Sequence, residues 1–220
     1  MTRASEPPTA RADHRVAQVD EGELLLRYRD KGDRGAFDEL VHRYERELYS
    51  YLRRYLGDAS LADDVFQATF LQVYRKRHLY EEGRPFRPWL YAIATHQAVD
   101  ALRKAGRHQA VSLDAEQTSH EVAAGSLLQL LEAEAPSPTA QLEHEEQREW
   151  IRAEVDKLPE HLRSVVLLTY YQGLKYREVA EILDIPVGTM KSRLHTALGR
   201  IHTAWQQTRD GKEQSGDGRA

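Results

Sequence analysis

The sequence predicts an all-α protein: two small helical domains joined by a flexible acidic linker. Apolar residues recur at the three- and four-residue spacing of amphipathic helices in both halves, and we find no segment with the two-residue period of a strand. Between the halves, residues 108–147 contain no Lys or Arg but several Asp and Glu. The expected parts are a disordered tail over 1–20, a first domain over 21–107, the linker over 108–147, a second domain over 148–206 and a polar tail over 207–220.

Composition excludes several classes of protein. The chain of 220 residues has no Cys, so it lacks disulfides, thiol nucleophiles and cysteine metal sites, which fits a reducing cytoplasm. No apolar run approaches the ~20 residues of a membrane span, and the N-terminus lacks the apolar core of a secretory signal. We therefore expect a cytoplasmic protein without membrane insertion.

Two helices are expected to open the first domain. Leucines at 24–26 lie in a short helix that begins near Glu21 and that Gly32 ends. A longer helix follows, and Gly57 is its expected C-terminal stop. Its apolar stripe consists of Phe37, Leu40, Val41, Tyr44, Leu48, Tyr51, Leu52 and Tyr55.

Two further helices complete this domain. Ser60 and Asp63 form a capping-box pattern at the start of a helix that runs to about Lys76. Gly83 and Pro85 then break the chain before a fourth helix. The fourth helix has an apolar stripe and a cationic last turn, formed by Phe86, Trp89, Leu90, Ile93, Ala94, Ala98 and Leu102 and by Arg103, Lys104 and Arg107.

The linker differs in charge from the segment before it. Basic residues outnumber acidic ones between Arg75 and Arg107, whereas the linker contains Asp and Glu but no Lys or Arg. Such a split lets one segment meet nucleic acid while another is repelled by it. The linker also holds Gly125, Pro136 and Pro138, and its LLQLLEAEA segment has the composition of a transient helix.

The second domain is predicted to hold a helix-turn-helix. A helix begins at Leu158-Pro159 and ends at Gly173, and a short helix with one apolar face follows. A tight turn over 184–186 leads into a last helix that reaches about Trp205. Ala180 is small where the short helix must cross the last one, which is the arrangement of a helix-turn-helix.

The last helix has two contrasting faces. Its core face consists of Met190, Leu194, Ala197 and Ile201, and its opposite face of Gly188, Lys191, Ser192, His195, Thr196 and Gly199. The opposite face carries no carboxylate, as expected of a helix that enters a groove lined by phosphates. The alternative is an ordinary helical hairpin with a solvated face.

These residues carry a resemblance to a known family. The segment LPEHLRSVVLLTYYQGLKYREVAEILDIPVGTMKSRLHTALGRI closely resembles region 4 of bacterial RNA polymerase sigma factors of the extracytoplasmic-function class, within the sigma-70 family. LADDVFQATFLQVYRKR and GRPFRPWLYAIATHQAVDALRK in the first domain resemble region 2 of the same class. Two motif sets in the right order, with an acidic linker between them, cover most of residues 21–206 and are more specific than either set alone.

The resemblance implies that the last helix reads the −35 element of a promoter. The positions that face bases in this class are occupied by Lys191, Ser192, His195 and Thr196. Thr189 and Arg193 fit phosphate contacts, with Lys175 and Arg177 as additions, and Gly188 lets a phosphate approach the first turn. Many members carry Arg where this chain has Thr196, so the −35 sequence stays open.

The resemblance also implies that the first domain holds the opened −10 element. The expected DNA contacts are Arg84, Arg87, His96, Arg103 and Lys104. His96 stands where the class usually has Asn, so the −10 preference is expected to differ. Arg103 and Lys104, like Arg107, fit ordinary cations of a helix C-terminus equally well.

The loop over 79–87 matches the loop that captures a flipped base in this class. Tyr80, Phe86 and Trp89 would offer aromatic surface there. The alternative is that Phe86 and Trp89 anchor the fourth helix in the core, and for Trp89 we favour that alternative.

Asp63, Asp64 and Gln67 match the segment that contacts core RNA polymerase in this class. They share the outer side of the third helix, and Asp63 can act as a cap as well. Adjacent carboxylates on a helix point about 100° apart, so this pair does not form a metal site unaided. The acidic linker resembles the segment that threads the RNA path of the polymerase, with a plain soluble tether as the alternative.

We therefore predict a non-catalytic initiation factor, monomeric when free, that binds core RNA polymerase and promoter DNA and needs no cofactor or metal. An anti-sigma factor is a further partner that the resemblance implies, although no residue identifies it. A first alternative is a helix-turn-helix regulator that binds operators without polymerase, but such proteins usually dimerise and no dimerisation heptad is present. A second is a metal-dependent nuclease, but the 10 His residues are scattered and no catalytic motif is found.

Overall fold

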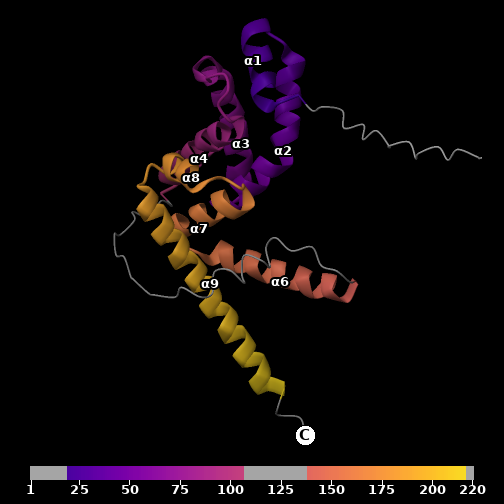
Figure 1. Cartoon of the computed structure of the whole chain (residues 1–220), viewed down its shortest axis with the longest axis vertical. Helices are drawn as coiled ribbons and strands as arrows, with labels where there is room; N and C mark the ends of the chain where they lie inside the picture. The colour runs from indigo at the N-terminus through magenta and orange to yellow at the C-terminus, as the bar shows by residue number, and fades with distance from the viewer. Residues whose placement is uncertain (1–18, 107–137, 217–220) are drawn as a thin grey trace, which may run out of the picture.

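The computed structural model describes residues 19–106 and 138–216, and the side chains within 19–106 and 146–208. Those residues form helices and turns without a strand, as predicted. Figure 1 shows two groups of helices, α1 to α4 (residues 21–104) and α6 to α9 (residues 138–216), which meet where α8 (Tyr176–Ile182) packs on α4 (Phe86–Lys104). Residues 1–18 of the tail predicted over 1–20, and the linker up to residue 137 with its LLQLLEAEA segment, lie outside the described residues.

The first two helices begin and end at polar and glycine signals. Asp20 caps α1 (Glu21–Lys31), because its carboxylate accepts a hydrogen bond from the Gly22 N–H at 2.8 Å. Asp33 caps α2 (Arg34–Leu56) through the Ala36 N–H at 3.1 Å. Gly32 and Gly57 end these helices in the left-handed conformation, which confirms both predicted stops.

The third helix begins at a different cap from the one predicted. Asp58 caps α3 (Ala59–Lys76), accepting a hydrogen bond from the Leu61 N–H at 3.1 Å. The capping box predicted at Ser60 and Asp63 is therefore wrong, because Ser60 already lies inside the first turn, where its side chain cannot reach forward as a cap does. A short 3₁₀ turn, η1 (Arg77–Leu79), and a loop then lead into α4 (Phe86–Lys104).

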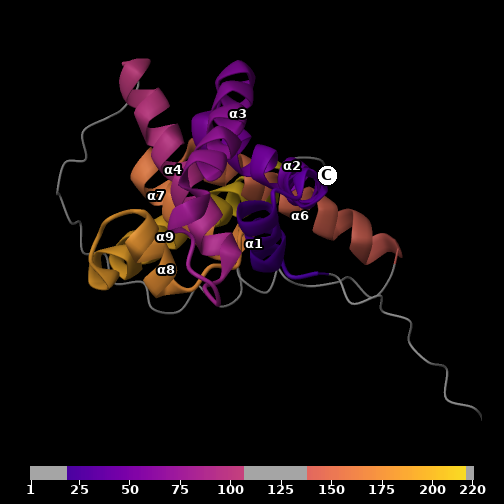
Figure 2. The same cartoon turned by 90° about the horizontal axis from the view of Figure 1, so that it is seen from above.

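The second group differs from prediction at both ends. Helix α6 (Pro138–Lys157) begins inside the predicted linker, because Pro suits the first turn of a helix and the following chain is rich in helix formers. Helix α9 (Val187–Gly216) continues beyond Trp205, since no Pro stops it and an interior Gly costs only about 1 kcal/mol. Figure 1 and Figure 2 both show α6 projecting from the packed helices.

The helix predicted between Leu158 and Gly173 is divided. After α7 (Glu160–Val166) the chain widens into a π-helical turn, η2 (Leu167–Tyr171). The Gln172 N–H donates to the Leu167 carbonyl oxygen at 3.1 Å, five residues back. Gly173, with φ 63°, ends the segment as predicted.

The core runs through both groups without a break. The predicted stripe of α2 is largely confirmed, with Phe37 and Val41 half-buried at its edge. Its fully buried members are Leu40, Tyr44, Leu48, Tyr51, Leu52 and Tyr55. Trp150 of α6 packs edge-to-face on Trp205 of α9, with ring centroids 4.9 Å apart. None of the described helices is long and apolar enough to cross a membrane.

We expect Gly22→Ala to destabilise the protein although Ala is the better helix former. A Cβ at this position would lie 2.5 Å from the Tyr80 hydroxyl oxygen and 2.9 Å from the capping oxygen of Asp20. Tyr80 is buried, so its ring cannot yield without repacking the core. Urea denaturation should show a loss of about 1–3 kcal/mol in the free energy of unfolding.

The matched control is Gly35→Ala, also in the first turn of a helix. Its Cβ would lie 3.5 Å from the nearest carboxylate oxygen, an ordinary contact, so this change should be neutral or stabilise by up to about 1 kcal/mol. Equal effects of the two substitutions would contradict the steric argument.

Candidate nucleic-acid interface

Helices α8 (Tyr176–Ile182) and α9 form the predicted helix-turn-helix. The Lys175 N–H donates to the Glu178 carboxylate at 2.7 Å and so opens α8. In the turn, Asp184 has a φ of 51°, and the Ile185 N–H donates to the Ala180 carbonyl oxygen at 3.0 Å. Ala180 is buried, which allows the two helices to approach.

The predicted core face of α9 is confirmed: Met190, Leu194, Ala197 and Ile201 are buried. On the opposite face Gly188, Lys191 and Ser192 are exposed, and open space surrounds the position of a Cβ at Gly188. Thr189, Arg193, His195 and Thr196 are half-buried. The face that the resemblance assigns to −35 DNA is thus accessible at its N-terminal end and partly covered further along.

Hydroxyl groups on this face are held by their own helix. Ser192 Oγ donates to the Thr189 carbonyl oxygen at 2.9 Å, and Thr196 Oγ1 donates to the Ser192 carbonyl oxygen at 3.0 Å. Each hydroxyl has thereby used its proton on the backbone and keeps oxygen lone pairs that can accept from a base edge.

The electrostatic surroundings of α9 are positive. Burial, followed by the charges of Arg193 and Arg200, lowers the pKa of His161 on α7. Burial also lowers the pKa of Arg193 itself. No acidic residue occurs in the sequence between Val187 and Gln207, so little opposes an approaching phosphate along this part of α9.

The residues assigned to −10 DNA spread along α4 and the loop before it. Arg84 is exposed and its Nε lies 3.5 Å from a carboxylate oxygen of Glu81. His96, Arg103 and Lys104 are exposed on α4. A carboxylate oxygen of Asp100 lies 3.7 Å from Arg103 Nη1. Arg107 lies outside the described residues.

The aromatic residues of the loop belong to the core rather than to the surface. Tyr80 and Phe86 are only 3% and 4% exposed, so the aromatic surface predicted for them is wrong in this arrangement. Trp89 packs on both, with ring centroids 5.3 Å and 5.9 Å away, as the favoured alternative stated. Arg29 Nη1 donates to the Tyr80 carbonyl oxygen at 2.9 Å and ties the loop to α1.

Arg87 is half-buried and connects the two groups of helices. It forms an ion pair with Glu47 of α2, and its Nε donates to the Gln172 carbonyl oxygen at 2.9 Å. Its Nη2 also donates to the Gln172 side-chain oxygen at 3.1 Å, and Tyr91 donates to Glu47 at 2.8 Å. Burial alone would lower the pKa of Arg87, but hydrogen bonding to Glu47 raises it, so this cation stays charged.

A second set of contacts crosses the same boundary. Arg163 of α7 donates from Nη2 to the Tyr55 carbonyl oxygen at 2.9 Å, and from Nη1 to the Asp156 carbonyl oxygen at 2.9 Å. The Tyr55 hydroxyl donates to Glu160 at 3.1 Å. Arg163, whose role the sequence left open, thus binds main-chain oxygens of both groups.

These boundary residues were missed in the sequence because no local pattern marks them. Glu47 and Gln172 lie 40 and 85 positions from Arg87 along the chain. Arg87 was recognised as a functional cation, but the partners of a cation this far apart follow only from tertiary packing. Its predicted contact with −10 DNA stays a prediction, and it requires this network to open.

The residues assigned to core polymerase are exposed together. Asp63, Asp64 and Gln67 lie on the outer side of α3. The inward side is buried or half-buried, as predicted, and consists of Ala62, Val65, Phe66, Thr69 and Val73. Among the described residues no group of three or more His, Asp or Glu is placed to hold a metal ion.

Family comparisons match both groups of helices. "Sigma-70 region 2" matches residues 40–108 and "Sigma-70, region 4" matches residues 148–201. The chain is 34% identical to the ECF RNA polymerase sigma factor SigW of Bacillus subtilis over 165 residues, which cover 75% of this chain and 86% of the relative. It is also 34% identical to the ECF RNA polymerase sigma-E factor of Escherichia coli K12 over 176 residues, 80% of this chain and 89% of the relative.

Solved structures share the fold. CnrH in complex with the cytosolic domain of CnrY is similar with a TM-score of 0.56 at 22% identity, over 86% of this chain and 99% of that one. The sigma factor RpoE of Bartonella quintana, in complex with the anti-sigma factor NepR, has a TM-score of 0.54 at 18% identity, over 77% of this chain and 96% of that one.

We expect Arg87→Ala to loosen the contact between the two groups of helices. The change removes the ion pair with Glu47 and the hydrogen bonds to Gln172, and because the pair is partly exposed its loss should cost on the order of 1 kcal/mol. Energy transfer between dyes on α1 and α6 in the free chain should report a longer mean distance. Arg84→Ala is the control, because Arg84 pairs with Glu81 inside its own loop. If both variants keep the wild-type distance, Arg87 does not hold the groups together.

Proposed function

The chain belongs to the extracytoplasmic-function sigma factors of the sigma-70 family, and we propose that it directs promoter-specific initiation by core RNA polymerase. The observation that supports this most is the match of both regions in order on one chain, with 34% identity over 75% of its length. In this proposal α9 recognises the −35 element, α4 recognises the −10 element and helps melt it, and α3 contacts the polymerase.

The −35 role rests on the face of α9. Lys191 and Ser192 are exposed at its N-terminal end, the end that enters the major groove in a helix-turn-helix. Gly188 leaves room for a phosphate beside the first turn, where free N–H groups point outward. Thr189 and Arg193 flank this end and are proposed to contact the backbone, while His195 and Thr196 face the bases further along.

The proposed −10 role is based on exposed basic residues and on His96, which stands where the class usually has Asn. Arg84, His96, Arg103 and Lys104 are exposed on one helix and its preceding loop, and Arg87 joins them when its network opens. Cations along this length suit the backbone of a single strand. His96 is proposed to contact a −10 base in the place where the class usually has Asn.

The polymerase contact is proposed for Asp63, Asp64 and Gln67, which are exposed side by side on α3. RNA synthesis itself belongs to the polymerase, so the chain is proposed to have no catalytic step, cofactor or metal of its own. It acts where bacterial transcription takes place, in the cytoplasm. An anti-sigma factor is a further proposed partner, because the similar RpoE was solved bound to one.

Promoter recognition requires the packed arrangement to open. Elements centred about 25 base pairs apart lie roughly 85 Å apart on straight duplex, at ~3.4 Å per base pair. Helix α8, directly before the reading helix α9, packs on α4, so the two domains lie against each other here. A chain as long as 107–137 reaches on the order of 100 Å when fully extended, which is enough to let the domains part.

The alternative, a regulator that binds operators without polymerase, differs from the proposed factor in its expected oligomeric state. A dimeric regulator needs a second copy to read two half-sites, whereas the proposed factor reads two different elements with two domains of one chain. A stable dimer with a preference for palindromic DNA would favour that alternative.

We expect the purified chain to give discrete transcription starts with bacterial core polymerase. Genomic DNA from its own source is the template, and the RNA 5′ ends are sequenced. Starts that share −35 and −10 sequences upstream would support the proposal and reveal what His96 and Thr196 prefer. Failure of the folded chain to bind core polymerase would refute it.

We expect Lys191→Ala to weaken binding of −35 duplex DNA and to reduce its dependence on salt. Loss of one phosphate or base contact costs about 1–3 kcal/mol, and loss of a phosphate contact reduces the slope of log affinity against log salt by about 1. Fluorescence anisotropy at several salt concentrations measures both. Lys31→Ala, an exposed Lys on α1, is the control and should bind like wild type. An unchanged affinity in Lys191→Ala would remove Lys191 from the interface.

A further inference from the structure

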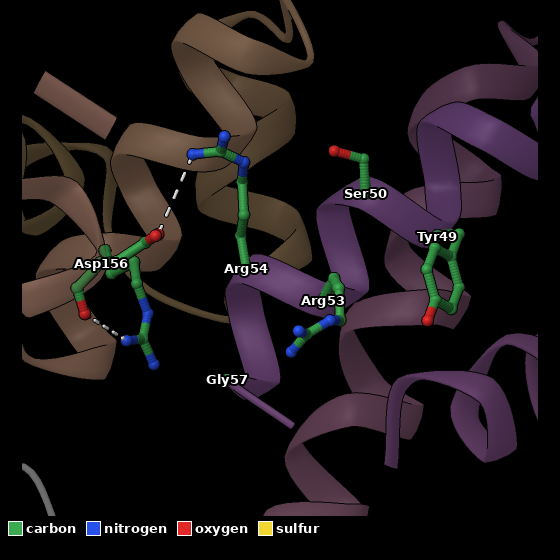
Figure 3. Close-up of a pocket in the computed structure, with 7 residues that line it drawn as sticks. Tyr49, Ser50, Arg53, Arg54, Gly57 and Asp156 are labelled. Carbon is green, nitrogen blue, oxygen red and sulfur yellow. Dashed lines mark hydrogen bonds and ion pairs between the residues drawn. The ribbon is translucent and has the colours of Figure 1, made fainter. Parts of the chain in front are cut away.

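A pocket with a volume of about 570 Å³ lies where α2 meets α6 and α7 (Figure 3). Three Arg and a single Asp are among its lining residues, and Tyr49 forms part of the same wall. Figure 3 shows Arg53 and Arg54 from adjacent positions of α2, with Asp156 facing Arg54 across the space. The lining is therefore cationic overall.

The protein neutralises these cations incompletely. Arg163 is hydrogen-bonded to two main-chain oxygens, those of Asp156 and Tyr55, which are neutral acceptors. Arg54 Nη1 lies 3.9 Å from the Asp156 carboxylate, too far for a hydrogen bond, and the guanidinium lies over the ring of Tyr171 at 5.0 Å. The residues that line the pocket thus include one carboxylate and three guanidinium groups, so positive charge is in excess.

Two guanidinium nitrogen atoms of these arginines lack a hydrogen-bond partner within the part of the chain that the structure describes. Arg54 Nη1 and Arg163 Nε are both shielded from solvent, and neither has a hydrogen-bond partner among the described residues. A buried donor without a partner is unfavourable, the more so when it is charged. Arg53, by contrast, is exposed and has its guanidinium free to turn toward a ligand.

We propose that this pocket binds a small anion bearing a phosphate or pyrophosphate group. One guanidinium group can donate to two phosphate oxygens at once. An anion bound beside Asp156 would also balance the positive charge that this carboxylate leaves. The volume suits a small molecule and is far too small for a DNA duplex. This inference goes beyond the proposed function and does not depend on it.

The test is calorimetric titration of the full-length free chain with inorganic pyrophosphate and, in parallel, with ADP. We expect saturable binding of pyrophosphate with a stoichiometry of one. Arg53→Gln should weaken it about tenfold, the loss of one charged hydrogen bond. Arg46→Gln, at an exposed Arg on the same helix but outside the pocket, should bind like wild type.

The ADP titration identifies the part of the ligand that is recognised. Equal affinity for ADP and pyrophosphate assigns the site to the phosphates alone, and tighter binding of ADP assigns it to a nucleotide. If Arg53→Gln loses its fold, as judged by circular dichroism, Arg54→Gln replaces it. Absence of saturable binding by the folded wild type, or equal weakening in Arg46→Gln, would overturn the proposal. Neither result bears on transcription, because no polymerase is present.

Discussion

A single guanidinium group, that of Arg87, joins three segments at the boundary between the two groups of helices. It lies at the start of α4, pairs with Glu47 of α2 and donates to the main chain and side chain of Gln172. The π-helical turn η2 ends at Tyr171, directly before the Gln172 carbonyl that faces this cation. Three elements distant in sequence thus meet at one planar, charged donor, and its fixed fork suits this task better than a Lys ammonium.

The ion pair between Arg87 and Glu47 is partly open to solvent. The side chains of Arg87 and Glu47 are 34% and 38% exposed, so water and salt reach the pair and its contribution is moderate. An initiation factor needs such a contact, because its two reading surfaces must separate by roughly 85 Å on promoter DNA.

Local patterns in the sequence predicted most of the fold. Helix stops at Gly32, Gly57 and Gly173 and the core face of α9 follow from residue type and period, which act within a few positions. The cap at Asp58 was missed because Asp58 and Ser60 are both favourable N-cap residues two positions apart. Only the geometry of the backbone decides which of them caps the helix. Exposure at the candidate site depends on tertiary packing, so neither the burial of Tyr80 nor the partners of Arg87 could be read from the chain.

The boundary between the domains is electrostatically asymmetric. At one end, the opposite charges of Arg87 and Glu47 attract across it. At the other end, Arg54 on α2 and Arg163 on α7 bring like charges to one pocket with Asp156 between them. Dissolved salt weakens the attraction at the first end and relieves the repulsion at the second, so its effects on closure oppose each other. An anion held between the arginines acts at the second end alone, which makes a specific ligand a more selective influence on closure than ionic strength.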